Sequence, residues 1–258
     1  AALGAASCTA NYEDINRNPY EVTAEDMERD GYAMRSFMTT MQSWVIPADV
    51  NQCQFTDLLL GGPYGGYIAD ANSGFNAGKF STYDPQSNWS PVFYRVVYTN
   101  EMTNFTELCK VTEDENAIAV AKVVKVAGVH RVADTYGPIP YTQVMASKTE
   151  SLEVAYDTQE EVYTAMFTEL DDVIASLQDN LSLPSDAFGR DDGVYSGNIS
   201  QWLKFANSLK LRMAMRLTEV KPDLAKSKAA EAIAAGVITT NADNAMMHTS
   251  DNRTTLIY

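Results

Sequence analysis

Apolar residues recur every three or four positions over most of this sequence, and this spacing limits the possible folds more than any other feature. It places the apolar side chains on one face of an α-helix. No convincing pairs of alternating strand segments accompany it. We therefore predict an all-α chain whose helical hairpins could stack as in tetratricopeptide arrays, although no clean 34-residue repeat is present. The six predicted helices cover about residues 23–46, 88–108, 114–135, 157–177, 200–217 and 222–236.

Several of these helices carry start and stop signals. Thr23 is a predicted N-cap, and Asp157 with Glu160 resembles a capping box at the start of the fourth helix. Pro222 suits the first turn of the sixth helix, because its missing N–H is not needed there. Gly236 suits the end of that helix.

The third predicted helix contains the apolar run "AIAVAKVVKVAGVHRVA", which only Lys122, Lys125 and Arg131 interrupt. These charges and its length rule out a membrane span, which needs about 20 apolar residues. We predict a helix that is buried on most sides.

The stretch "DTYGPIPYTQV" follows this helix and places two prolines within three residues. Each proline fixes φ near −65° and keeps the preceding residue out of the helical region, so the helix must end by about Tyr136. Gly137 is the expected C-terminal cap, and Ile139 is held extended between the prolines. The segment is therefore predicted to be a rigid strap between helices.

The stretch between the first two predicted helices, "LLLGGPYGGYIADANSGFNAGKFSTYDPQSNW", is long and irregular. Irregular connections of this length are usually functional or disordered, and its aromatic content argues against disorder. Tyrosine rings can stack on sugar faces, while Asn side chains donate to and accept from hydroxyl groups. We expect Phe80 and Trp89 to pack against the helices. The candidate ligand-binding residues are Tyr64, Tyr67, Asn72, Phe75, Asn76 and Tyr83.

The composition excludes some classes of partner. The formal net charge is −15, and binding to nucleic acid or to anionic lipid rests on clustered Lys and Arg. We therefore expect neither a nucleic-acid partner nor a simple electrostatic attachment to a membrane.

The sequence offers little catalytic or metal-binding apparatus. Its two histidines, His130 and His248, have no metal-ligand spacing, and His130 is expected to be a packing residue. No G-x-S-x-G elbow, P-loop or dinucleotide fingerprint is present, and "GRDDGVYSG" lacks the alternating ligands of a calcium loop. We predict no catalytic residue, metal or cofactor, although 34 carboxylates leave a glycosidase pair open.

Three cysteines do not make a disulfide framework. Cys53 and Cys109 could form a disulfide or could be small buried side chains. Cys8 follows "AALGAAS", which resembles the end of a signal peptide, so we predict that Cys8 is lipidated. Residues 1–22 would then be a signal-peptide remnant and tether, and residues 23–258 the helical domain.

Four segments together resemble the SusD/RagB family of outer-membrane nutrient-binding lipoproteins. "CTANYEDINRNPYEVT" is similar to the family's start after the lipidated cysteine, and "DTYGPIPYTQV" to its helix exit. "AYDTQEEVYTAMFTELDDVIASL" and "GNISQWLKFANSLKLRMAMRL" are similar to helices that follow. The motifs occur in the expected order and extend over essentially the whole chain.

This resemblance implies a fold of four tetratricopeptide-like hairpins with long irregular loops. It also implies a lipid-anchored protein on the surface of a Gram-negative outer membrane, which captures an oligosaccharide and passes it to a SusC-like TonB-dependent transporter. Family members are not enzymes, and the strap would be scaffold. Family chains usually continue well beyond Tyr258, so we expect the sequence to be a portion of a longer chain.

Three alternatives stay open at this point. The ligand could be a peptide, as for some family members. The chain could instead be a glycoside hydrolase, which would show turnover dependent on one acidic residue, or a helical adaptor that binds only proteins.

Overall fold

The computed structural model describes residues 31–47, 50–71, 79–144, 153–181, 189 and 192–247. The expectations for Cys8, Thr23 and His248, and for Asn72, Phe75 and Asn76, lie outside these residues. The described residues contain helices and two isolated β-bridges but no strand, which confirms the all-α prediction. In chain order the helical elements are α3 (Tyr32–Val45), α4 (Val50–Cys53), η2 (Gln54–Leu58), α5 (Gly61–Tyr64), η3 (Phe80–Thr82), α6 (Val92–Val97), η4 (Tyr98–Met102), α7 (Thr103–Val111), α8 (Glu115–Tyr136), α9 (Gln159–Asp179), α11 (Ile199–Arg216), α12 (Pro222–Ala235) and η5 (Asn241–Asp243).

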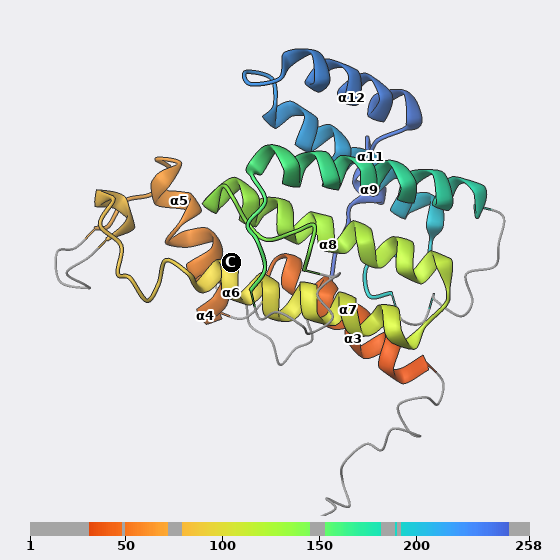
Figure 1. The fold of residues 1–258 in the computed structure, drawn as a ribbon, viewed down its shortest axis with the longest axis horizontal. Helices are drawn as coiled ribbons and strands as arrows, with labels where there is room; N and C mark the ends of the chain where they lie inside the picture. The colour runs from red at the N-terminus through yellow and green to blue at the C-terminus, as the bar shows by residue number, and fades with distance from the viewer. Residues whose placement is uncertain are drawn as a thin grey trace, which may run out of the picture.

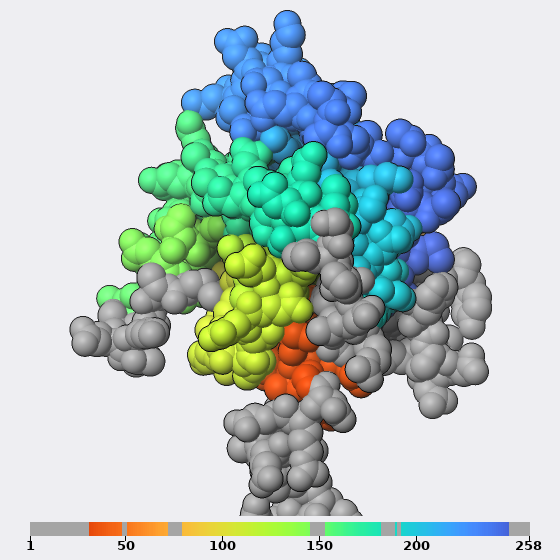
Figure 2. Space-filling model, turned by 90° about the vertical axis from the view of Figure 1, so that its right-hand side faces the viewer, coloured from red at the N-terminus to blue at the C-terminus, as the bar shows by residue number. Residues whose placement is uncertain are grey.

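The long helices stack in layers that follow the order of the chain (Figure 1). Helix α3 packs on α7 and α8, α8 packs on α9, and α9 packs on α11, which pairs with α12. The described residues therefore contain three packed pairs of helices, made by α3 with α7, α8 with α9, and α11 with α12. Figure 2 shows the same order on the surface, from α3 at the bottom to α12 at the top. The short elements α4, η2 and α5 project to one side of this stack (Figure 1).

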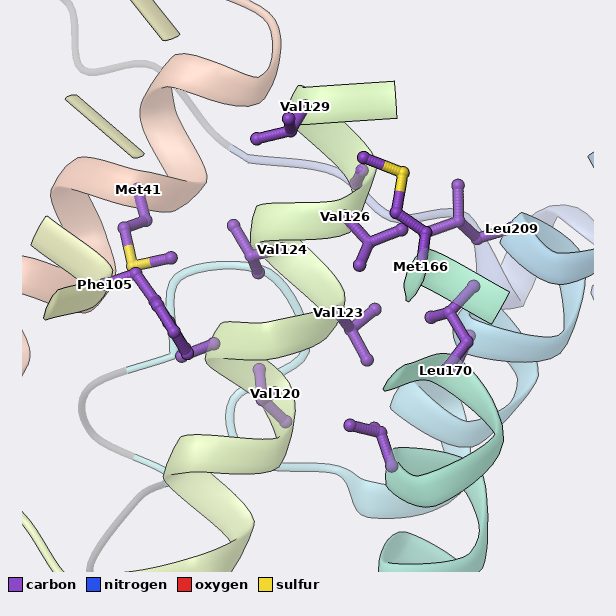
Figure 3. Close-up of a cluster of buried hydrophobic side chains, with 14 of the residues drawn as sticks. Met41, Phe105, Val120, Val123, Val124, Val126, Val129, Met166, Leu170 and Leu209 are labelled. Atoms are coloured by element: carbon purple, nitrogen blue, oxygen red, sulfur yellow. The ribbon is translucent and has the colours of Figure 1, made fainter. Parts of the chain in front are cut away.

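Helix α8 is the centre of the core, and its side chains are buried around nearly its whole circumference. In Figure 3 Val124 faces Met41 and Phe105, whereas Val123 faces the side of Met166 and Leu170. Two layers of helices therefore bury opposite faces of one helix, which explains why its sequence is apolar almost throughout. The prediction of a helix buried on most sides is confirmed.

The helix ends follow the predicted signals with one correction. The backbone of Gly137 has a φ of 78° and that of Gly236 a φ of 101°, which are conformations that favour glycine after a helix. The capping box of α9 is formed by Thr158 and Glu161, one residue later than predicted. Asp157 is engaged elsewhere, because its carboxylate accepts hydrogen bonds from the backbone N–H groups of residues 141 and 142.

The predicted strap is present and is fixed at two points. The backbone of Ile139 pairs with that of Asp157 through hydrogen bonds of 3.2 and 3.0 Å, and the Ile139 side chain is fully buried. The Tyr141 hydroxyl donates to Glu169 of α9, whose other carboxylate oxygen lies 2.5 Å from the buried ammonium of Lys125. The strap therefore joins α8 to α9 through a buried polar network, which confirms its role as scaffold.

The second predicted helix is continuous through α6, η4 and α7, and η4 is a short π-helical segment within it. This turn carries Glu101, which is fully buried and whose carboxylate oxygens have no hydrogen-bond partner among the described residues. Burial raises the pKa of Glu101 well above its usual range, and the nearby charge of Arg131 opposes this shift. The carboxyl group lies against Gly128 of α8.

His130 is also buried in α8, as a packing residue. Its Nδ1 lies 3.0 Å from the carbonyl oxygen of Val126, whereas Nε2 has no hydrogen-bond partner among the described residues. The pKa of His130 is lowered to about 4, mainly by burial. The bond to Val126 opposes this shift, and the positive charges of Arg212, Arg216 and Arg131 contribute to it.

We expect His130 to make the protein sensitive to acid. The unfolded chain binds a proton at this side chain near pH 6.5, whereas the folded chain does so only near pH 4. The stabilisation is therefore present above pH 6.5 and is lost as the pH falls toward 4, by about 3 kcal/mol in full. Urea unfolding between pH 7 and 4 should show a smaller loss for His130→Gln than for the native protein. Equal losses in both proteins would contradict this assignment.

Candidate functional site

Two tyrosines predicted to bind ligand form a stacked pair on the projecting side of the fold. The rings of Tyr64, at the end of α5, and Tyr83, just after η3, lie 5.3 Å apart and are nearly parallel, at 7°. The ring of Phe80 packs edge-on against Tyr64, with 5.7 Å between the centroids. Tyr83 is 75% exposed. We call Tyr64 and Tyr83 the aromatic platform.

Local backbone structure places this platform. Residues Lys79 and Asp84 form an antiparallel bridge, and the η3 turn between them leaves Tyr83 with a φ of 57°. This left-handed backbone is uncommon for a tyrosine and costs of the order of 1 kcal/mol. Beside it, the Ser81 hydroxyl donates to the Asp70 carboxylate, which ties η3 to the chain after α5. The segments that carry the exposed rings are therefore joined to each other by a polar contact.

Tyr67 does not belong to the stacked pair. Its backbone N–H donates to the carbonyl of Gly62 at 2.9 Å, and its side chain is 88% exposed. The ring lies over Gly65, where an added Cβ would be only 2.8 Å from it. Tyr67 is thus a separate exposed ring on the same projecting segment.

The two aromatic residues expected to pack do so. Phe80 is buried, with 4% of its surface exposed, and Trp89 packs edge-on against Phe55 at 5.3 Å. These contacts pack the projecting segment against the helical core, so the exposed tyrosines belong to a segment that is itself well packed.

Arg131 helps to hold the candidate site in place. In the sequence it is visible only as a charged residue within an apolar run. From α8, its Nη2 lies 2.7 Å from the Asp57 carboxylate in η2, and its Nη1 donates to the carbonyl of Val45 at the end of α3. Its guanidinium also lies 5.1 Å from the centroid of the Phe93 ring. Arg131 therefore attaches the segment that carries the platform to the central helix.

The "GRDDGVYSG" stretch is a structural turn in the part that is described. The Asp192 carboxylate is 4% exposed and accepts from Trp202 Nε1 at 2.6 Å and from Gln42 Nε2 at 2.9 Å. It also accepts from backbone N–H groups of residues 194, 195 and 197. The described residues contain no group of three or more His, Cys, Asp or Glu side chains placed to hold a metal ion.

A hollow of about 400 Å³ lies between the end of α9 and the start of α11. Its polar side chains have structural roles: the Tyr195 hydroxyl donates to the carbonyl of Asp243, and Asn198 caps α11. It is separate from the platform, and its chemistry gives no reason to place the site there.

Two other questions are decided in the described part of the chain. Cys53 and Cys109 are both free thiols, so the disulfide alternative is wrong. None of the helices that the structure describes is long and apolar enough to cross a membrane.

Comparison with known proteins gives a consistent family match. A family model described as "SusD-like: Susd and RagB outer membrane lipoprotein" matches residues 14–258. A crystal structure of a SusD homolog from Bacteroides uniformis is 42% identical, with a TM-score of 0.73, over 86% of this chain and 46% of that one. A SusD homolog from Bacteroides ovatus is 35% identical, with a TM-score of 0.77, over 87% and 45%. No curated protein matches this chain.

A third solved structure is that of a chitin-binding SusD homolog from Flavobacterium johnsoniae. It is 32% identical to this chain, with a TM-score of 0.75, over 81% of this chain and 44% of that one. The chain thus spans less than half the length of the solved relatives it matches.

Proposed function

Because the chain belongs to the SusD/RagB family of outer membrane lipoproteins, we propose that it captures an oligosaccharide at the cell surface and passes it to a TonB-dependent transporter. In this proposal the protein binds its ligand and does not cleave it. A lipid on Cys8 would anchor the protein, and two or more acyl chains give stable attachment to a membrane. Mass spectrometry of protein extracted from membranes tests the anchor, and an unmodified Cys8 would contradict it.

The observation that supports this function most strongly is the aromatic platform. Tyr83 is largely exposed, yet Tyr64 stacks on one face of its ring, so the ring is held in place before a ligand arrives. Pre-organised rings lose little freedom on binding, which favours affinity. The outer face of such a ring suits the apolar face of a sugar, and the nearby Ser81 and Asp70 suit its hydroxyl groups.

The ligand we favour is an uncharged glycan. The formal net charge of −15 would repel an anionic polysaccharide. The homolog from Flavobacterium johnsoniae is described as chitin-binding, and chitin is an uncharged polymer. A peptide is less suited to this surface, since a flat ring pair offers no edge for main-chain hydrogen bonding.

We expect Tyr83→Ala to weaken glycan binding about fivefold, because stacking on a single aromatic ring contributes on the order of 1 kcal/mol. The measurement is calorimetry with neutral linear oligosaccharides of the chitin, starch, cellulose and xylan types. Tyr32→Ala is the matched control, because Tyr32 is also an exposed tyrosine. Tyr32 is the first residue of α3, whereas Arg131 bonds to Val45 at the other end of that helix.

Three results would count against this function. If no oligosaccharide of the panel binds but peptides do, the peptide alternative is favoured. A binding signal that survives Tyr83→Ala would place the site elsewhere on the protein. Release of shorter sugars from a bound oligosaccharide would show an enzyme.

A further inference from the structure

The guanidinium of Arg131 bonds to two different elements at once. Its Nη2 lies 2.7 Å from Oδ1 of Asp57 in η2, and its Nη1 donates to the carbonyl of Val45 at the end of α3. A planar guanidinium holds two acceptors in a fixed geometry, which a lysine ammonium does not impose. Its Cζ also lies 5.1 Å from the centroid of the Phe93 ring in α6. Arg131 therefore holds three elements around one side chain.

Arg131 belongs to a helix whose other side chains are mostly apolar and buried. Its side chain is 19% exposed and that of Asp57 is 36% exposed, so their ion pair is only partly in contact with solvent. Apolar residues can often replace a buried ion pair with no loss of stability. Stability alone therefore gives little reason for an arginine at this position. Directional bonds to Asp57 and Val45, by contrast, fix the position of the elements that they join.

The element that Arg131 holds leads directly to the aromatic platform. Helix α5 begins two residues after the end of η2 and packs against it, on the projecting side of the fold (Figure 1). The backbone N–H of Tyr64, at the end of α5, donates to the carbonyl of Leu60, whose side chain belongs to the hydrophobic core. The Tyr64 ring stacks on that of Tyr83. Because residues 57–64 are nearly all helical, a movement of Asp57 is expected to move the platform.

We propose that Arg131 is a positioning residue for the aromatic platform, and that its bond to Asp57 sets the affinity for a ligand that Arg131 does not touch. This inference rests on the function proposed above and adds a residue outside the site that controls it. Without the bonds of Arg131, the rings of Tyr64 and Tyr83 are free to take other positions, and a ligand must order them when it binds. The affinity then falls although both rings are still present.

The first test measures glycan affinity by calorimetry, with the oligosaccharide of the panel that binds most tightly. Arg131→Met keeps a long side chain and removes both bonds, so it should weaken binding about threefold. Asp57→Asn removes only the charge of the partner and should also weaken binding. Arg216→Met is the matched control and should leave the affinity unchanged, because Arg216 is paired with Asp134 at 2.8 Å and joins α11 to α8. All affinities are measured at a temperature at which circular dichroism shows each variant to be folded.

A double variant separates positioning from a general structural effect. In the Tyr83→Ala background the exposed ring is gone, so Arg131→Met should weaken binding much less than it does in the native protein. If the two losses add fully, Arg131 acts on the affinity by another route and the inference is wrong. It is also wrong if Arg131→Met binds the glycan as tightly as the native protein.

The second test needs no ligand, because hydrogen exchange reports how often a backbone N–H is released from its bond. The N–H groups of Tyr64 and Tyr83 donate to the carbonyls of Leu60 and Phe80 at 3.2 and 3.0 Å. In Arg131→Met both N–H groups should exchange faster, by about threefold or more, whereas those within α9 and α11 should keep their native rates. Native rates at both tyrosines, or faster exchange throughout the protein, would contradict a positioning role.

The proposed function and this inference fail in different ways. If no glycan binds the native protein, the proposed function is wrong and so is the effect of Arg131 on glycan affinity. Hydrogen exchange then decides whether Arg131 positions the platform. If a glycan binds through Tyr83 but Arg131→Met keeps the native affinity and exchange rates, the function stands and Arg131 is not a positioning residue.

Discussion

Gly128→Ala is expected to destabilise the protein by about 3 kcal/mol or more, although the same change in an ordinary helix interior stabilises by up to about 1 kcal/mol. The sign reverses because an added Cβ at this position would lie 1.8 Å from Oε2 and 2.2 Å from Cδ of Glu101. Both residues belong to the core between η4 and α8, where the Glu101 side chain is fully buried. Urea unfolding measures the loss directly.

A double variant tests whether Glu101 is the cause. With the carboxyl group removed, Glu101→Ala should relieve the overlap, so Gly128→Ala should cost far less in the Glu101→Ala background than in the native one. Gly61→Ala is the matched control, because an added Cβ there meets nothing within 4 Å. A Gly128→Ala variant as stable as Gly61→Ala, or one that Glu101→Ala does not rescue, would refute this account.

The sequence predicts the helices well, because the spacing of the apolar residues indicates directly which face of each helix is buried. It predicts their ends less exactly. Asp157 and Glu160 have the residue types of a capping box, yet Thr158 and Glu161 form it, because the Asp157 carboxylate is bonded to a strap 15 and 16 residues earlier in the chain. A local pattern cannot show such a competing partner. The π-helical segment η4 also cannot be recognised from the sequence, because its residues continue the helical spacing of the residues on both sides.

The site is predictable only in part. The sequence predicts ligand-binding tyrosines in a long irregular stretch, but it does not show that Tyr64 stacks with Tyr83. That stacking depends on the Lys79–Asp84 bridge and on the left-handed backbone of Tyr83. The role of Arg131 depends on contacts with residues more than 70 positions away.

Asp192→Ala should be the second severe substitution, with a loss of about 3 kcal/mol. The carboxylate is buried and accepts hydrogen bonds from the Trp202 indole, the Gln42 amide and three backbone N–H groups. Removing it leaves these donors buried without an acceptor, and each unsatisfied group costs about 1–3 kcal/mol before the structure relaxes. Asp179→Ala, at an exposed position near the end of α9, is the control and should change stability by less than about 0.5 kcal/mol.

The Asp192 carboxylate also matters beyond its own turn, because it joins the first and the last of the described pairs of helices. Gln42 of α3 donates to Asp192 and accepts from the backbone N–H of Gly193 at 2.9 Å, while Trp202 belongs to α11. Trp202→Phe keeps an aromatic ring and removes one donor, so it should cost less than Asp192→Ala. If the two losses are equal, packing around Trp202 rather than the carboxylate holds α11 to α3. If the loss for Asp192→Ala is the larger, one buried carboxylate holds α3 to α11, through a hydrogen bond between residues 150 positions apart, Gln42 and Asp192.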